Sequence, residues 1–144
     1  MSLATIAGAD FGRTAADYAK YRPGFPESFF ERLEAFGIGA AGQRIVDLGT
    51  GTGTLARGLA QRGAAVVGVD LAPEQLVEAA KLDAAAGVNV DYVVGRGEAT
   101  GLSGAAFDVV IAGQCWHWFD SAAAMREAAR LLKPDGRLVI CHFD

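Results

Sequence analysis

The chain is poor in the residues that mark several protein classes. Its 144 residues include only two cysteines and four prolines, and 13 basic side chains face 17 acidic ones, for a net charge of −4. Cys115 and Cys141 stand in no CxxC or Cys/His pattern, so we expect two reduced thiols rather than a metal site or a disulfide. The acidic balance also argues against nucleic acid as the main partner, because phosphate backbones bind basic surfaces.

Long apolar runs are missing as well. No stretch is long enough to cross a bilayer, and the N-terminus carries no basic-then-apolar leader pattern. We therefore expect a cytoplasmic protein with no membrane partner, while the sequence gives no indication of oligomeric state. Hydrophobic residues make up 51% of the chain, which is enough to build the core of one domain without disulfides or metal ions to stabilise it.

Short apolar runs alternate with helical patterns from residue 43 onward. The runs predict strands over 44–48, 65–70, 88–94, 107–112 and 138–141. Because each run is continuously apolar, we expect a parallel sheet that is buried on both faces by helices. This is an α/β, Rossmann-like, doubly wound and mainly parallel architecture. The expected division is an N-terminal helical lid or cap over 1–40 and a core over 41–144.

Prolines, glycines and polar capping residues mark the expected ends of the helices and the expected turns. One helix follows Pro26 and ends at Gly37, and another starts at Pro73 and ends at Gly87. A helix after residue 120 is capped by Asp120 or Ser121. The residues 134–136, Pro-Asp-Gly, predict a turn before the last strand.

A glycine-rich turn follows the first of these strands. Gly49 and Gly51 allow a sharp bend and a close approach of a ligand to bare main chain. Asp70 lies 21 positions after Gly49, at the end of the second strand, where a carboxylate can accept hydrogen bonds from both hydroxyls of a ribose. Ligands of such sheets lie beyond the carboxyl ends of the strands, so the pattern predicts a nucleoside site.

The identity of the nucleoside follows from two further residues. The dinucleotide fingerprint requires a third glycine at position 54, but this sequence has Thr54 and places the glycine at Gly53. Asp47, just before the turn, would repel a pyrophosphate and would suit a ligand that carries an ammonium and a sulfonium. These residues favour S-adenosylmethionine over NAD. An NAD(P)-dependent oxidoreductase and a non-catalytic module that binds S-adenosylmethionine remain as alternatives.

Nearly the whole chain resembles the class I S-adenosylmethionine-dependent methyltransferases. The ordered motifs that carry the resemblance are 47–53, 67–71, 95–99, 107–110 and 132–138. The start of the chain, with Tyr18, Tyr21, Arg22 and Pro23, resembles a small-molecule branch that includes trans-aconitate and ubiquinone-pathway methyltransferases. The resemblance implies methyl transfer to a small-molecule acceptor and the first five of the family's seven strands, so we expect the core to be incomplete at its C-terminal end.

The resemblance also implies a set of cofactor-binding residues. They are Arg22, Asp47, Gly49, Thr50, Gly51, Asp70, Leu71, Gly97, Glu98 and Gln114. Within this set, Asp47 would lie near the ammonium of the cofactor, Leu71 against the adenine, and the Gly97 N–H at the adenine edge. Arg96 departs from the family pattern, because many relatives have an acid at that position that accepts from the adenine amino group.

Substrate and catalytic roles fall on the aromatic segment 115–119 and on the N-terminus. His117 is the candidate general base, with a hydrogen-bonded structural histidine as the alternative. Trp118 and Tyr21 are the candidate substrate contacts, although Trp118 and its aromatic neighbours could equally well pack the next helix onto the sheet. No metal ligand is expected.

Overall fold

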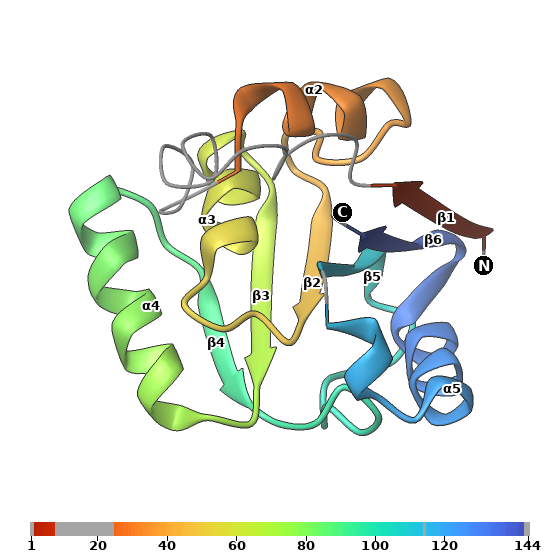
Figure 1. Ribbon diagram of the computed structural model, residues 1–144. Helices are drawn as coiled ribbons and strands as arrows, with labels where there is room; N and C mark the ends of the chain where they lie inside the picture. The colour runs from red at the N-terminus through yellow and green to blue at the C-terminus, as the bar shows by residue number, and fades with distance from the viewer. Residues whose placement is uncertain (1, 8–24, 114, 143–144) are drawn as a thin grey trace.

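The alternation of apolar runs and helical patterns produces a layered α/β structure (Figure 1). The computed structural model describes residues 2–7, 25–113 and 115–142. The strands are β1 (Ser2–Ala7), β2 (Arg44–Leu48), β3 (Ala65–Asp70), β4 (Asp91–Val94), β5 (Phe107–Gly113) and β6 (Leu132–His142). The helices are α2 (Glu27–Ala35), α3 (Thr54–Gln61), α4 (Pro73–Ala86) and α5 (Ser121–Leu131), with a single 3-10 turn, η1 (Trp116–Trp118).

The strands form one six-stranded sheet in the order β1-β6-β5-β2-β3-β4, and each neighbouring pair is parallel. From β2 the chain winds outward through β3 to β4, and it then returns to the other side of β2 to form β5 and β6. The strand order therefore reverses between β2 and β5. The predicted Rossmann-like, doubly wound sheet is confirmed, and the switch point places a ligand site at the carboxyl ends of β2 and β5.

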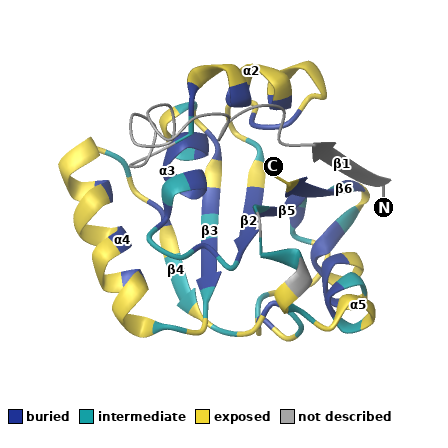
Figure 2. Cartoon of the chain, viewed as in Figure 1, coloured by how far each residue is buried: buried dark blue, intermediate teal, exposed yellow. Residues whose placement is uncertain are grey.

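Each face of the sheet has its own apolar core. Residues of β2, β5 and β6 that point to one face pack with Phe29, Phe30 and Leu33 of α2 and with α3. Residues that point to the other face pack with Ala128 and Leu131 of α5. Figure 2 shows the resulting pattern, in which the central strands are buried and the outer side of α4 is exposed. Burial on both faces explains why the strands are continuously apolar in sequence.

The helices begin and end at the proline, glycine and capping residues that were predicted to bound them. Helix α2 starts directly after Pro26, and α4 has Pro73 at its first turn and ends at Gly87, which has a left-handed φ of 72°. The Asp120 carboxylate caps α5 by accepting a hydrogen bond from the Ala123 N–H at 3.2 Å. These local rules hold because each concerns backbone groups within one turn of the helix end.

Two strand boundaries differ from the prediction. The strand expected over 88–94 begins only at Asp91, because the Val88 N–H is used to close α4 on the Asp83 carbonyl at 3.0 Å. The last strand is longer than the predicted 138–141, and the residues 134–136, expected as a turn, lie inside β6. The register jumps there from the Phe107–Leu132 pair to the Val109–Arg137 pair, so the Pro-Asp-Gly residues are taken up by an irregularity in the ladder.

The strand β1 was not predicted. Its residues pair in parallel with β6, from Ser2 opposite Arg137 to Ala7 opposite His142. Pairing with the edge of an existing strand is a long-range contact, which no local sequence pattern predicts.

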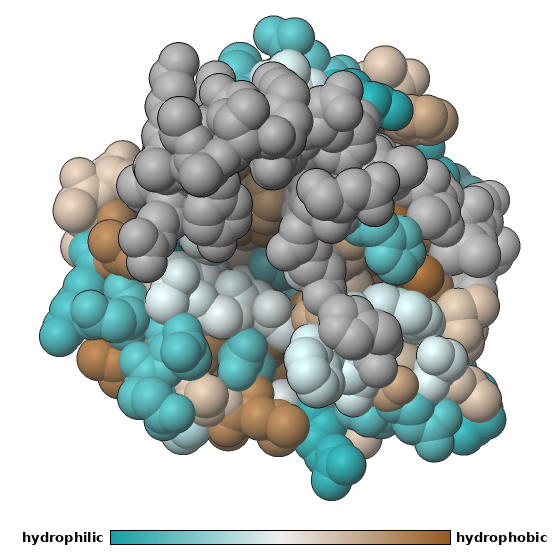
Figure 3. All heavy atoms as spheres, viewed as in Figure 1, coloured by the Kyte–Doolittle hydropathy of each residue, from teal (hydrophilic) through white to brown (hydrophobic). Residues whose placement is uncertain are grey.

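Among the described residues, no helix is both long and apolar enough to cross a membrane. On the face in Figure 3, hydrophilic residues predominate over α4, with hydrophobic ones interspersed, consistent with exposed fractions of 57% at Val77 and 45% at Leu82.

The packing of α2 on α3 predicts the effect of one substitution. Gly58 of α3 faces the ring of Phe30, and a Cβ at this position would collide with that ring. We expect Gly58→Ala to lower the free energy of unfolding by about 2 kcal/mol through overpacking, as measured by urea denaturation. In a Phe30→Leu background the same substitution should be much less harmful, and equal losses in both backgrounds would contradict the proposed collision.

Candidate functional site

The turn after β2 is shaped by glycines. Gly49 and Gly51 have φ values of 69° and 57°, in the left-handed region that side chains disfavour. A Cβ at Gly49 would lie 2.7 Å from the Cys115 Sγ, so the turn also needs the space. The Thr50 N–H donates to the Val69 carbonyl at 2.9 Å, which ties the turn to β3. The sharp backbone turn predicted from the sequence is present.

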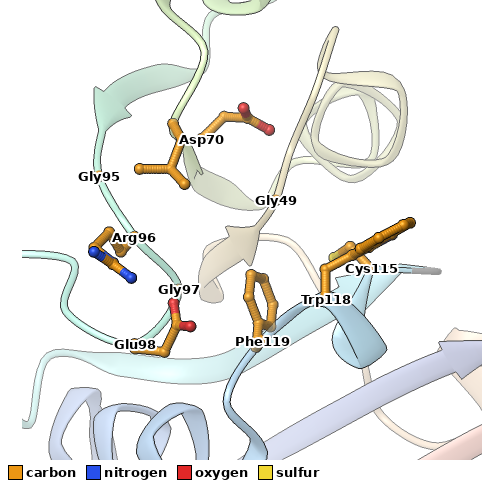
Figure 4. Close-up of a pocket in the computed structure, with 10 residues that line it drawn as sticks. Gly49, Asp70, Gly95, Arg96, Gly97, Glu98, Cys115, Trp118 and Phe119 are labelled. Atoms are coloured by element: carbon orange, nitrogen blue, oxygen red, sulfur yellow. The ribbon is translucent and has the colours of Figure 1, made fainter.

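Asp70 links the ends of β2 and β3. One carboxylate oxygen accepts the Gly51 N–H at 2.9 Å, and the other accepts the Ala72 N–H at 3.0 Å. A carboxylate oxygen has two acceptor positions, so each oxygen retains capacity for a further donor. Asp70 thus shapes the turn and still presents acceptors to the space beyond the strand ends (Figure 4).

Asp47 lies beneath the turn rather than on its surface. Its side chain is buried, with 2% exposure, and it accepts a hydrogen bond from the Thr50 hydroxyl at 2.8 Å. Burial raises the pKa of Asp47 to about 7, the Thr50 hydrogen bond opposes this shift, and the negative charge of Asp70 adds to it. Close to neutral pH the carboxyl therefore exchanges between its acid and its carboxylate form.

A cleft of about 300 Å³ opens beside the turn. Its lining comes from the ends of β2 and β3, from the loop after β4 and from the segment after β5 (Figure 4). The lining residues are Gly49, Asp70, Leu71, Gly95, Arg96, Gly97, Glu98, Cys115, Trp118 and Phe119. The cleft combines bare backbone, an exposed leucine, two carboxylates, one guanidinium, a thiol and aromatic rings. This mixture of a few polar groups on an apolar wall is typical of small-ligand sites.

The loop after β4 is anchored to α5. Thr100 donates to the Glu127 carboxylate through its hydroxyl at 2.6 Å and its N–H at 2.9 Å. Glu98 accepts the Asp120 N–H at 3.1 Å, just ahead of α5. These bonds fix Gly97, which is buried against Phe119: a Cβ at Gly97 would lie 2.7 Å from the ring. The loop therefore presents main chain rather than side chain at this point of the cleft.

The segment after β5 forms the aromatic wall of the cleft. Trp116 and Phe119 meet edge to face, with their ring centroids 5.9 Å apart. Trp118 has 77% of its surface exposed and lines the cleft. Burial, and secondly the charge of Asp47, raise the pKa of the Cys115 thiol to about 12, so the protonated thiol donates to the Leu48 carbonyl at 3.0 Å. Cys115 is a packing residue under the turn.

The structure brings together part of the predicted site. The predicted residues that line the cleft are Gly49, Asp70, Leu71, Gly97, Glu98 and Trp118. Asp47, Thr50 and Gly51 lie in or under the turn and are not among the described residues that line the cleft. Tyr21, Arg22 and Gln114 lie outside the described residues, as does the side chain of His117. The site roles predicted for these four residues therefore stay predictions.

The cleft residues Arg96 and Phe119 were not among the predicted site residues, although they lie in the segments 95–99 and 115–119 that were singled out from the sequence. Gly95 and Cys115, from the same two segments, were likewise not predicted as site residues. Both come directly after strands of the switch-point region, β4 and β5, and the rule that ligands lie beyond the carboxyl ends of strands could have drawn attention to them. Among the described residues, no group of three or more His, Cys, Asp or Glu side chains is arranged to hold a metal ion.

Comparisons with known proteins place this geometry in context. A family model described as a methyltransferase domain matches residues 46–140. An uncharacterized methyltransferase of Mycobacterium tuberculosis is 38% identical over 128 residues, which cover 89% of this chain and 49% of that protein. The ubiquinone biosynthesis O-methyltransferase of Azorhizobium caulinodans is 40% identical over 100 residues, which cover 69% of this chain and 40% of that protein.

Solved structures agree with the sequence matches. An S-adenosylmethionine-dependent methyltransferase from Mesorhizobium loti superposes with a TM-score of 0.65 at 30% identity, over 77% of this chain and 51% of that one. The chain thus spans about half the length of the relatives that it matches.

The buried carboxyl of Asp47 predicts a pH dependence of stability. Its pKa rises from 3.8 to about 7 on folding, so between these values the unfolded chain releases a proton that the folded chain retains. Stability is therefore lost as the pH rises through this window, by about 4 kcal/mol in total, and the loss is constant above it. Asp47→Asn should remove this slope in urea denaturation between pH 4 and pH 8.

A second variant tests the cause of the shift. Thr50→Val removes the hydrogen bond that opposes the effect of burial, so the upper end of the window should move to higher pH. If the curves of the wild type and of Asp47→Asn run parallel over the whole range, the Asp47 carboxyl does not titrate as described.

Proposed function

We infer that this chain, which belongs to the S-adenosylmethionine-dependent methyltransferase family, binds S-adenosylmethionine in its cleft and transfers a methyl group to a small-molecule acceptor. One observation carries the inference: Asp70 and the glycine turn meet at the switch point of the sheet, joined by the Gly51–Asp70 hydrogen bond. This is where a doubly wound sheet binds a nucleoside.

The residues of the cleft fit the cofactor. The acceptor positions of Asp70 suit the ribose hydroxyls, and Leu71, which is 64% exposed, offers an apolar surface for the base. At Gly49 and Gly97 a Cβ would collide with Cys115 or Phe119, so the walls there are main chain that a ligand can approach closely. Two carboxylates, Asp70 and Glu98, and one cationic side chain, Arg96, line the cleft, and this negative balance suits a positively charged ligand better than a pyrophosphate.

Within this proposal, the glycine turn with Gly49, Thr50 and Gly51 holds the amino-acid tail of the cofactor. Asp47 compensates the charge of its ammonium from below. Gly97 and Glu98 border the adenine, with the Gly97 N–H as the donor. Arg22 and Gln114 complete the predicted set from outside the described residues. The division into a helical lid over 1–40 and a core over 41–144 stays part of the proposal, with the lid role limited to residues other than β1 and α2, because β1 pairs with β6 and α2 packs on the sheet. Action in the cytoplasm is also proposed.

When bound, the cofactor supplies an already activated methyl group. The contribution of the chain is to orient the two reactants and to exclude water, and alignment of this kind can supply about 7–11 kcal/mol. The aromatic wall with Trp118 and Phe119, together with Tyr21, is the proposed acceptor side. An aromatic wall suits an apolar acceptor and also attracts a cation. The quinone-pathway name of the Azorhizobium relative supports a small apolar acceptor for this chain.

Binding experiments distinguish the proposal from its alternatives. Calorimetric titration with S-adenosylhomocysteine and with NADH should show binding of the first alone. An oxidoreductase would reverse this result. A non-catalytic module would bind S-adenosylhomocysteine but would release none from S-adenosylmethionine with any acceptor, in a screen of hydroxylated aromatics and quinols.

Asp70→Ala should weaken the binding of S-adenosylhomocysteine by about ten- to a hundredfold, because hydrogen bonds to a charged acceptor contribute about 1.5–3 kcal/mol each. Asp70→Asn, which keeps one carbonyl oxygen, should lie between the wild type and the alanine variant. Asp91→Ala, at an exposed site on β4, is the matched control. Unchanged affinity of Asp70→Ala in calorimetry would remove Asp70 from the site.

His117 is proposed as the general base for an acceptor that must lose a proton. With a hydroxylated acceptor, His117→Ala should lower kcat by about 10²–10⁴-fold and leave the affinity for S-adenosylhomocysteine unchanged. His142→Ala, at an exposed position of β6, should retain full turnover. Wild-type turnover by His117→Ala would assign this histidine a structural role.

A further inference from the structure

We propose that Arg57, Asp83 and Tyr92 form a positioning network that holds the carboxyl-terminal half of the glycine turn, Thr52 and Gly53, in its ligand-binding shape. The inference rests on the proposed function, because it assigns a purpose to residues behind the cofactor cleft. The three side chains come from α3, α4 and β4, and none of them lines the cleft itself.

The Arg57 guanidinium spans two partners. Its Nε lies 3.1 Å from one Asp83 carboxylate oxygen, and its two terminal nitrogens donate to the Thr52 carbonyl at 3.3 and 2.5 Å. The Tyr92 hydroxyl donates to the second Asp83 oxygen at 2.7 Å. Burial and the neighbouring Asp83 raise the pKa of Tyr92 above its ordinary value, so its hydroxyl keeps the proton that it donates.

A buried ion pair between two helices carries a large desolvation free energy. Arg57 and Asp83 are only 7% and 3% exposed, and apolar side chains would pack α3 against α4 at lower desolvation cost. The guanidinium offers something that apolar side chains lack, namely a rigid fork with donors in two directions. On one side the guanidinium forms an ion pair with Asp83, and on the other its two terminal nitrogens donate to the carbonyl of the turn. Helix α3 begins at Thr54, and its N-cap residue Gly53 provides no side-chain hydrogen bond, so the bond to the Thr52 carbonyl supplies an anchor at that point.

Tyr92 supports the same turn from below. The register places Tyr92 beside Gly68, and Gly68 beside Asp47. A Cβ at Gly68 would lie 2.8 Å from both the Tyr92 ring and the Thr50 hydroxyl oxygen, and a Cβ at Gly53 would collide with the Tyr92 hydroxyl. The ring is therefore seated against two glycines. Gly53 is thus favoured for two reasons: its φ of 79° lies in the left-handed region, and a side chain there would displace the Tyr92 hydroxyl.

The test compares two variants of the full chain with a matched control. Arg57→Lys keeps the positive charge beside Asp83 but loses the fork, and Tyr92→Phe keeps the ring but loses the hydroxyl. Arg62→Lys makes the same chemical change at the other end of α3, where Arg62 pairs with Glu27 and Glu34 of α2. Calorimetry measures the affinity for S-adenosylhomocysteine and for 5′-methylthioadenosine, which lacks the amino-acid tail, and thermal denaturation measures stability.

If the network positions the turn, both variants should bind S-adenosylhomocysteine about five- to tenfold more weakly, while their affinity for methylthioadenosine changes less than about twofold. Arg62→Lys should leave both affinities unchanged. A loss of stability with unchanged affinities would overturn the proposal, and so would an equal loss for both ligands, which would mean a general disturbance of the cleft.

Two further outcomes are also decisive. If Arg57→Lys does not fold, Tyr92→Phe alone decides between the two readings, because it removes one oxygen atom and leaves the packing of the ring in place. If the wild-type chain binds no S-adenosylhomocysteine, the proposed function fails, and the network loses its role with it. Wild-type binding with unaltered variants overturns only the network.

Discussion

The hydrogen bond from the Gly51 N–H to the Asp70 carboxylate is the interaction on which the site depends. It joins the turn after β2 to the tip of β3, and these two points border the place where the strand order reverses. The bond forms only if the backbone bends into the left-handed region at Gly49 and Gly51. The hydrogen bond between the Gly51 N–H and the Asp70 carboxylate thus requires both the backbone freedom of the glycines and the strand order of the sheet.

Much of this arrangement could be predicted, because its signals are local. Gly49 and Gly51 are required by backbone angles, Asp70 ends an apolar run, and Pro73 and Gly87 delimit α4. The fold followed from the alternation of such signals. What could not be predicted depends on contacts between distant elements: the pairing of β1 with β6 and the register jump of β6, and the hydrogen bond that holds Cys115 under the glycine turn.

Glu98 shows where an assignment by motif and an assignment by contact diverge. The resemblance places this residue beside the adenine, and the structure does place it on the cleft. Its carboxylate also accepts the N–H that precedes α5, and Asp70 combines the two duties in the same way. In this small site a single carboxylate organises the main chain and faces the ligand, so a substitution changes the shape of the cleft and its chemistry together.

The short turn η1 has a consequence for the optical properties of the protein. The chain contains two tryptophans, and both belong to η1, one packed edge to face on Phe119 and the other at the mouth of the cleft. Indole emission responds to the polarity of its surroundings. The tryptophan fluorescence of the molecule therefore originates from η1 alone, beside the cleft, where a single spectrum combines a partly buried indole and a solvated one.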